Sequence, residues 1–283
     1  MSINSDLERN KNEDRMRLLV AGLDRKLDQI KKGGGVKRIE KEHAKGKLSA
    51  RERLAKLFDN NCERFEIGAL VGDGMYEEYG GCPSGGVVVE VGRIHGRQCI
   101  AVANDATVKA GAWFPITAKK NLRAQEIALE NRLPIVYLVD SAGVFLPLQD
   151  EIFPDKEHFG RMFRNNAKLS SAGIPQIAAV MGSCVAGGAY LPIMSDESLI
   201  VEGTGSIFLA GSYLVRAAIG EDIDNETLGG STTHCEISGV IDYPCKDDDD
   251  ALKTIRDLAS HWNPTTNAAN FSRSDPKKPS GYS

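Results

Sequence analysis

The sequence is poor in the residues and motifs that mark several large classes of protein. It has five histidines and two tryptophans in 283 residues, which leaves little room for a histidine-rich metal site or an aromatic binding platform. Its six cysteines include no C-x-x-C pair, so a zinc ribbon is not expected. It contains no run of about 20 apolar residues, the length that a membrane-spanning helix needs.

Net charge and cysteine content limit the expected binding partners and the cellular compartment. The net charge of −4 does not favour binding to nucleic acid or to a membrane surface. Scattered cysteines in a chain of this size are typical of reduced, buried thiols. The first 20 residues, MSINSDLERNKNEDRMRLLV, are too acidic for a transit peptide and lack the apolar segment of a signal peptide. We therefore expect a cytoplasmic protein with no metal ion, nucleic acid or membrane partner.

The motifs of the commonest catalytic sites are also missing. The sequence has no G-x-S-x-G elbow, no Walker A sequence, no G-x-G-x-x-G and no H-E-x-x-H. These absences disfavour a nucleophilic-serine hydrolase, a P-loop nucleotide site, a dinucleotide site and a zinc protease. The glycine-rich turns remain as candidates for function.

Strand-like and helix-like segments alternate between residues 85 and 260, which predicts the α/β class with helix-covered strands. Two β-branched runs around His95–Gly96 predict a hairpin. Continuous apolar runs at 133–140 and 174–182 predict strands buried on both faces. Further strands are expected at 197–203 and 206–211, and helices at 115–133, 155–173, 186–195, 212–220 and 247–262.

The N-terminal part is predicted to be helical. A charged helix is expected over residues 5–32, where three consecutive glycines end it, and a second helix over 47–59, where Ser49 and Glu52 form a capping box. We expect three parts: an N-terminal helical extension (1–44), one main domain (45–262) and a polar linker or disordered tail (263–283).

Two turns rich in small residues follow the buried strands, at 139–147 (VDSAGVFLP) and 182–192 (GSCVAGGAYLP). A helix beginning near Ala186 would present free N–H groups, and Gly187 and Gly188 would let a ligand oxygen approach the backbone closely. If the 143–144 peptide lies opposite, two N–H donors converge as an oxyanion hole, which stabilises negative charge on a carbonyl oxygen. The alternative is that these glycines only allow tight packing between strand and helix.

Several longer segments carry a more specific signal. They are RERLAKLFD, GGCPSGGVVVEVGRI, ANDATVKAGA, RAQEIALENRLPIVYLVDSAG, FPDKEHFGR, GSCVAGGAYLP and SIFLAGSYLVRAAIGEDIDNETLGGSTTHCEISGV. In the same order, they resemble the β (carboxyltransferase) subunit of biotin-dependent acyl-CoA carboxylases. The resemblance spans residues 45–262, and FPDKEHFGR is similar to the methylcrotonoyl-CoA carboxylase branch.

The resemblance implies a crotonase-like (ClpP-type) spiral of ββα units and a ligase activity. A carboxyl group moves from carboxybiotin to an acyl-CoA, expected to be 3-methylcrotonoyl-CoA of leucine degradation, through an enolate. The cofactor supplies the base, so the protein needs dipoles rather than a His or Glu. The catalytic donors implied are the backbone N–H groups of Gly187, Gly188 and Gly143. The partners implied are a biotin-carrying α subunit and further copies of the β subunit.

Expected substrate contacts surround the two turns. Ala142 and Val144 stand where the family commonly has Gly and Ala, so they are expected to shape the acyl pocket. Ala186 and Tyr190 are expected beside them, with core packing as the alternative for Tyr190 and for Phe145. Arg51 is a candidate to bind a phosphate of CoA, and so are Lys47 and Arg53. The alternative is that these three side chains lie on a solvated helix face.

The family also has a second, C-terminal crotonase-like domain, which is not found after about residue 265 of this sequence. We therefore expect at most half of an active site in this chain, unless a separate polypeptide provides the rest. Two alternatives stay open: a carboxyltransferase subunit of a glutaconyl-CoA-type decarboxylase, and a non-catalytic fragment that binds CoA or assembles with β subunits.

Overall fold

A computed structural model of the chain describes residues 3–152 and 156–262, and the tail expected over 263–283 lies outside these ranges. The helices are α1 (Ile3–Ile30), α2 (Val36–His43), α3 (Ala50–Leu57), α4 (Pro115–Asn131), α5 (His158–Ser171), α6 (Tyr190–Ile193), α7 (Ser212–Ile219), α8 (Asn225–Gly229) and α9 (Asp248–Ala259). The strands are β1 (Phe65–Glu66), β2 (Val87–Ile94), β3 (Arg97–Asn104), β4 (Ile135–Ser141), β5 (Gln176–Val185), β6 (Glu197–Val201), β7 (Ser206–Phe208) and β8 (Tyr243–Cys245). Short 3-10 segments are η1 (Glu77–Tyr79), η2 (Pro83–Gly86), η3 (Lys109–Gly111), η4 (Leu146–Ile152) and η5 (Ala186–Ala189), and η6 (Thr233–Ile237) is a π-helix.

The strands form one mixed sheet in the order β1-β2-β3-β4-β5-β6-β8. The hairpin predicted at His95–Gly96 is confirmed: β2 and β3 are antiparallel, with Ile94 opposite Arg97. Both turn residues have positive φ, as two-residue hairpin loops of type I′ require. From β3 onward the neighbouring strands run parallel, so the ends of β4 and β5 that lead into the glycine turns lie at the same edge of the sheet.

Strand β5 changes partner along its length. It pairs with β6 over residues 177–180 and with β7 over residues 183–185. The sequence places the end of this strand at residue 182, but the structure extends it to Val185. The prediction of a turn from residue 182 is therefore wrong: Ser183 and Cys184 belong to the strand, and the turn begins at Ala186. The pairing with β7 explains the difference, because a distant segment supplies the additional partners.

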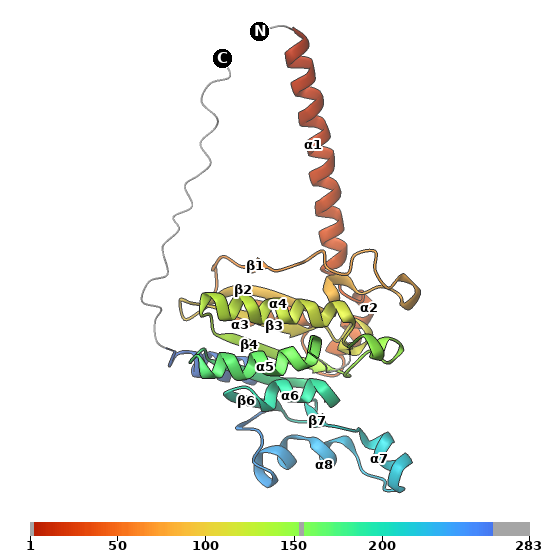
Figure 1. Ribbon diagram of the computed structural model, residues 1–283, viewed down its shortest axis with the longest axis vertical. Helices are drawn as coiled ribbons and strands as arrows, with labels where there is room; N and C mark the ends of the chain where they lie inside the picture. Colours follow the sequence, from red (N-terminus) through yellow and green to blue (C-terminus); the bar gives the residue numbers. More distant parts are fainter. Residues whose placement is uncertain (1–2, 153–155, 263–283) are drawn as a thin grey trace.

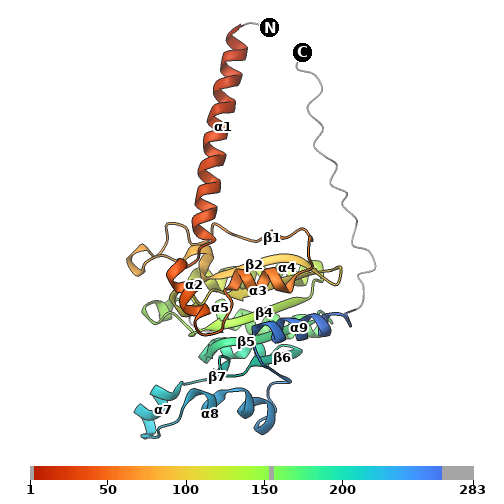
Figure 2. The same cartoon turned by 180° about the vertical axis from the view of Figure 1, so that it is seen from behind.

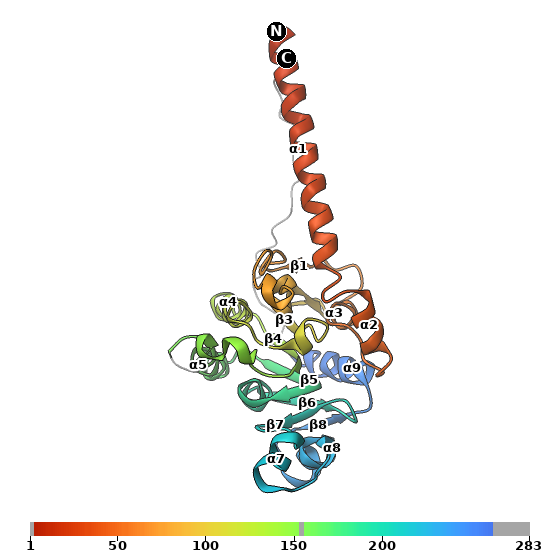
Figure 3. The same cartoon turned by 90° about the vertical axis from the view of Figure 1, so that its right-hand side faces the viewer.

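Helices cover both faces of the sheet, α4 and α5 on one and α3 and α9 on the other (Figure 3), and a hydrophobic cluster lies on each face. Side chains that alternate along a strand point to opposite faces. Tyr137 and Val139 of β4 accordingly pack with α4 and α5, whereas Val136 and Leu138 pack with α3 and α9. This arrangement confirms the prediction that residues 133–140 form a strand buried on both faces.

Three elements project from this central body (Figures 1 and 2). Helix α1 stands clear of the sheet, and helices α7 and α8 lie at the opposite end of the molecule. Helix α7 has no buried residue although its sequence is apolar, and Tyr213 is 89% exposed. Helix α2, which the sequence did not predict, turns back from the triple glycine and leads into α3, whose capping box at Ser49 and Glu52 is confirmed.

Gly182 is required for close packing of β5 against β4. A Cβ atom at this position would lie 1.9 Å from Oδ1 of the buried Asp140. We expect Gly182→Ala to lower the free energy of unfolding by about 1–3 kcal/mol, because the carboxylate or the strand has to move. Urea denaturation measures this change. Gly22→Ala is the control, since a Cβ there meets nothing within 4 Å, and an equal loss in both variants would contradict the packing argument.

Candidate functional site

The two glycine turns lie side by side at the edge of the sheet. Ser141, which ends β4, is paired with Cys184 near the end of β5. Gly143 of the first turn also approaches the end of the neighbouring strand: a Cβ on Gly143 would lie 3.1 Å from the carbonyl oxygen of Val185, the last residue of β5. The sequence leaves open whether the 143–144 peptide lies opposite the second turn, and the parallel pairing of β4 with β5 brings both turns to the same end of the sheet.

The first turn is held by the segment that precedes α4. The backbone N–H of Trp113 donates to Gly143 O at 2.8 Å, and the N–H of Phe145 donates to Trp113 O at 2.9 Å. Gly143 has φ +91°, and its own N–H donates to Ser141 Oγ at 3.1 Å. Successive N–H groups of an extended segment point to opposite sides. The donor that this turn directs away from Trp113 is therefore the N–H of Val144, on the 143–144 peptide. The N–H of Gly143, which the resemblance implies as a donor, is instead bonded to Ser141.

The second turn is a short helical segment. Its 3-10 part, η5, begins at Ala186 and continues into α6, which has only four residues. The first N–H groups of such a segment have no acceptor within it. A helix this short has a small macrodipole. Any stabilisation of a negatively charged ligand at this turn therefore comes from the local N–H groups. Ala186 itself has φ +53°, a left-handed conformation that costs free energy and occurs often at functional sites.

Gly187 and Gly188 are not needed for packing. A Cβ on Gly187 would meet the ring of Phe159 at 3.5 Å, an ordinary contact distance. For Gly188, the nearest atom among the described residues is Nε1 of Trp113, at 3.8 Å. Neither residue has a positive φ. The packing alternative is therefore wrong for these two glycines, although it holds for Gly182.

A row of aromatic rings lies beneath the second turn. The ring centroids of Trp113 and Phe159 are 4.9 Å apart, those of Phe159 and Phe163 are 5.9 Å apart, and those of Phe163 and Tyr190 are 4.8 Å apart. Trp113 and Phe159 are fully buried, whereas Tyr190 is 45% exposed. Tyr190 is thus not a core residue, and its role in the acyl pocket stays a prediction. Phe145 instead stacks on Phe114 at 4.2 Å, as a core residue does.

Comparison with known proteins decides the family. A model of the carboxyl transferase domain matches residues 41–281. The chain belongs to the carboxyl transferase family. It is 54% identical over 256 residues, or 90% of this chain and 44% of the relative, to a probable mitochondrial methylcrotonoyl-CoA carboxylase beta chain of Drosophila melanogaster. It is 51% identical over 251 residues, 89% of this chain and 47% of the relative, to a biotin-dependent 3-methylcrotonyl-coenzyme A carboxylase beta1 subunit of Mycobacterium tuberculosis.

A solved structure agrees with this assignment. The geranyl-CoA carboxylase beta subunit of P. aeruginosa superimposes with a TM-score of 0.78 at 33% identity, covering 89% of this chain and 46% of that one. The crotonase-like fold expected from the resemblance is therefore confirmed. The chain spans less than half the length of the relatives that it matches.

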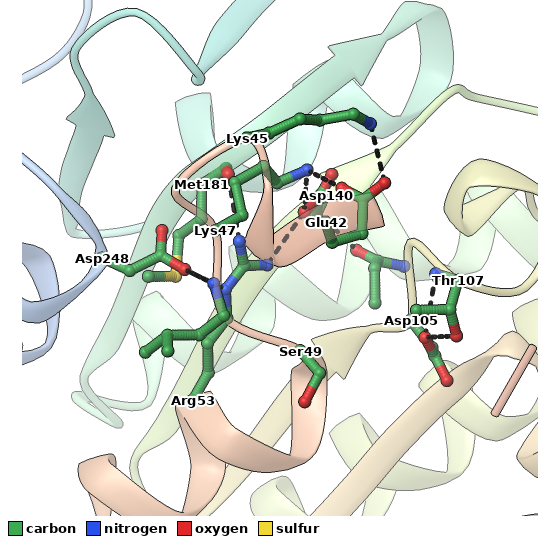
Figure 4. Close-up of polar contacts among 12 residues, drawn as sticks. Glu42, Lys45, Lys47, Ser49, Arg53, Asp105, Thr107, Asp140, Met181 and Asp248 are labelled. Atoms are coloured by element: carbon green, nitrogen blue, oxygen red, sulfur yellow. Dashed lines mark hydrogen bonds and ion pairs between the residues drawn. The ribbon is translucent and has the colours of Figure 1, made fainter. Parts of the chain in front are cut away.

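Behind the turns, this carboxyl transferase domain contains a buried cluster of charges (Figure 4). Arg53 is 1% exposed, and each of its guanidinium nitrogens is engaged. Nη1 bonds Asp140 at 2.9 Å, Nε bonds Asp248 at 2.8 Å, and Nη2 donates to Met181 O at 3.1 Å. Neither expectation for Arg53, a CoA phosphate or a solvated helix face, is correct.

Lys47 completes the cluster and is also buried. Its Nζ lies 2.7 Å from Asp140 Oδ2 and 3.0 Å from Glu42 Oε2, so it too is neither solvated nor free to meet a phosphate. Burial alone would raise the pKa of Glu42, but its ion pairs with Lys45 and Lys47 outweigh that effect and lower it. Asp140 is thus held by two cations, directly before the first turn.

Sequence reasoning missed Asp140 and Trp113. The signal for Asp140 was present, because a carboxylate at the end of a wholly apolar strand run needs a buried partner. Nothing in the sequence around Trp113 indicates that its ring reaches Gly188, which is 75 positions away in the numbering.

Arg51 already has a partner in the structure. Its guanidinium bonds both oxygens of Glu66, at 2.7 and 2.9 Å, and Glu66 accepts from Ser84 Oγ at 3.0 Å. Lys120 joins this chain by donating to Ser84 O, Ser84 Oγ and Val87 O at 2.8 Å each, and burial lowers its pKa to about 7. A CoA phosphate would have to compete with Glu66, so the role of Arg51 stays a prediction.

Other side chains of the carboxyl transferase motifs have structural surroundings. Nε2 of His234 lies 2.8 Å from Ile207 O, so this histidine has a structural hydrogen-bond partner. Burial raises the pKa of the Cys184 thiol, which keeps it protonated and unreactive. Within residues 3–152 and 156–262 we find no group of three or more His, Cys, Asp or Glu side chains placed to hold a metal ion. In the same part of the chain, no helix is long and apolar enough to cross a membrane.

The buried Arg53 can be tested against an exposed ion pair on the same helix. We expect Arg53→Met to lower the free energy of unfolding by about 3–5 kcal/mol, because it leaves Asp248 and part of Asp140 buried without a cation. Lys56→Met is the matched control, since the Lys56–Asp249 pair is largely exposed and contributes at most about 1 kcal/mol. Urea denaturation of both variants measures the difference, and similar losses would refute the assignment.

Proposed function

We propose that this chain is the acyl-CoA-binding part of the carboxyltransferase component of a biotin-dependent acyl-CoA carboxylase. In this proposal the thioester oxygen lies between the two turns and accepts hydrogen bonds from the N–H groups of Gly187 and Gly188 on one side and from the 143–144 peptide on the other. These donors stabilise the negative charge that develops on that oxygen when the acyl-CoA becomes an enolate.

The observation that carries the proposal is the open space at Gly187 and Gly188. At Gly182 a Cβ would overlap the carboxylate of Asp140, and at Gly143 the φ of +91° disfavours any side chain. Gly187 and Gly188 have ordinary backbone angles and room for a methyl group. Since packing does not require glycine at these two positions, we attribute the glycines to the close approach of a ligand to the backbone.

The chemistry needs little from the side chains of this site. Biotin, which we propose is carried by an α subunit, supplies the carboxyl group and the base when it is present. The chain binds and orients the thioester and holds the oxygen in a field of backbone dipoles. The raised pKa of Cys184 agrees with this division, because the thiol in the strand leading to the turn stays neutral.

The acyl group is proposed to be 3-methylcrotonoyl, as the names of the relatives suggest. The half-buried Val144 packs against the core next to the turn, and Ala142 is exposed. We propose that these two side chains line the acyl pocket beside the 143–144 peptide. Tyr190 and Ala186 are the proposed contacts on the other side.

Assembly, domain limits and compartment are further parts of the proposal. We propose that β-type subunits form a homo-oligomer, because the transcarboxylase 12S structure, which has a similar fold, is described as a hexamer. We also propose that the chain divides into an N-terminal extension (1–44), a main domain (45–262) and a tail (263–283). A cytoplasmic location stays a prediction, since the Drosophila relative is named as mitochondrial.

Reverse carboxyl transfer tests the proposal directly. The purified chain is mixed with 3-methylglutaconyl-CoA and free biotin, and CoA-thioester binding is followed in the same sample. We expect binding, because the acyl-CoA side of the site is in this chain. Turnover would mean that the chain makes a complete site, and binding without turnover that another polypeptide contributes the biotin side. Absence of binding would refute the proposal, and the decarboxylase alternative would fail with it.

Substitutions at the two open glycines test the donors. Gly187→Pro removes one N–H group, and we expect it to reduce transfer, or thioester affinity where the chain only binds, by about 100-fold. Gly188→Ala keeps the N–H but fills the space that the ligand needs, so it should weaken binding while leaving the free energy of unfolding within about 0.5 kcal/mol of the parent. Gly22→Ala on α1, far from both turns, should leave thioester binding unchanged and should not lower the free energy of unfolding, because alanine favours a helix more than glycine does. Normal binding by both turn variants would contradict the assigned donors.

A further inference from the structure

Trp113 lies next to both glycine turns. Its backbone forms a β-bridge with Val144, through the bonds to Gly143 O and Phe145 N. Its indole lies on the other side, where Nε1 is 3.8 Å from the position of a Cβ on Gly188. Trp113 therefore joins the first turn through backbone hydrogen bonds and lies beside Gly188 of the second turn through its ring.

The indole N–H of Trp113 has no hydrogen-bond partner among the described residues. The side chain is 1% exposed, so water does not reach the group. Buried donors are nearly always paired, because removing one from water without a partner costs free energy. An unpaired donor that persists at this place calls for a physical explanation.

The rest of the indole is well packed, so the unpaired N–H does not reflect a loose side chain. The ring contacts Phe159 at a centroid distance of 4.9 Å and belongs to the main hydrophobic cluster. The ring of Phe159 in turn lies beneath Gly187. Together the two rings support both glycines whose N–H groups we assign to the oxyanion site.

An N–H dipole in such a place acts through space. In a dry environment the interaction of a dipole with a charge several ångströms away is much stronger than in water. A fixed dipole beside the oxyanion site needs no reorganisation when negative charge develops there. The energy lost by leaving the N–H unpaired is then offset when the thioester oxygen becomes negative.

We propose that Trp113 is a positioning residue of the acyl-CoA site, which holds the 143–145 turn by its backbone, supports the 187–188 turn by its ring, and favours negative charge between them by its unpaired N–H. This inference rests on the proposed function, since it needs a thioester oxygen at the site. It adds to that function a residue outside both turns.

The test uses the full chain and acetoacetyl-CoA, whose enolate is detected by its ultraviolet absorption without any carboxyl transfer. In a Trp262→Phe background, Trp113 is the single remaining tryptophan. Biosynthetic incorporation of benzothienylalanine then replaces the indole N–H by sulfur at this position alone, with nearly the same shape. Trp262→Phe with ordinary tryptophan is the matched control.

We expect the control to bind acetoacetyl-CoA and to lower the pKa of its enolate relative to the free thioester. The sulfur analogue should raise the pKa of the bound ligand by about one unit, a ten-fold loss of enolate preference, while the affinity for CoA itself is unchanged. Binding should also shift the fluorescence of Trp113 in the control. Trp113→Phe, which removes the N–H and part of the ring, should reproduce the pKa change.

Three results would overturn the inference, and they are distinguishable. If the control binds and both proteins give the same pKa of the bound enolate, the N–H has no electrostatic role and the proposed function stands. If the control does not bind acetoacetyl-CoA, the proposed function fails and the inference fails with it. An unchanged Trp113 fluorescence on binding would contradict the placement of the ring beside the ligand.

Discussion

The burial of Asp140 is the constraint on which the arrangement of the site depends. This carboxylate lies inside the domain, where an unpaired charge is not tolerated, and it is held by Arg53 and Lys47. The same guanidinium bonds Met181 O on β5 and Asp248 at the start of α9. One buried cation therefore joins the two strands that lead into the glycine turns to helices from both ends of the described chain.

The glycines around this cluster have two different functions, which their surroundings separate. Gly182 has no side chain because the carboxylate of Asp140 occupies the space. Gly187 and Gly188 have no side chain although space is available, and they lie next to the rings of Phe159 and Trp113. The first kind fixes the distance between β4 and β5, and the second leaves the backbone accessible to a ligand. A site that relies on backbone dipoles needs both, since the dipoles are useful only if the strands that carry them cannot shift.

Local signals in the sequence were sufficient for the elements that are stable by their own pattern. The hairpin at His95–Gly96, the buried strand β4 and the capping box at Ser49 were predicted correctly, because turn chemistry, apolar runs and caps act over a few residues. Helix α2 and the last residues of β5 were missed. The end of β5 pairs with β7, about 20 residues further along, and such pairing leaves no local pattern in either segment.

The sequence by itself determined the α/β class, the family resemblance and the two turns of small residues, because these features follow from residue types and their spacing along the chain. Only the tertiary structure decided what the charged residues do. Arg53 and Lys47 look like solvent-exposed or phosphate-binding cations on a helix, yet they are buried against Asp140. The placement of Trp113 beside Gly188 was equally beyond the sequence. Both depend on contacts between residues far apart in the chain, and burial of a charge or of an N–H is a property of the packed structure alone.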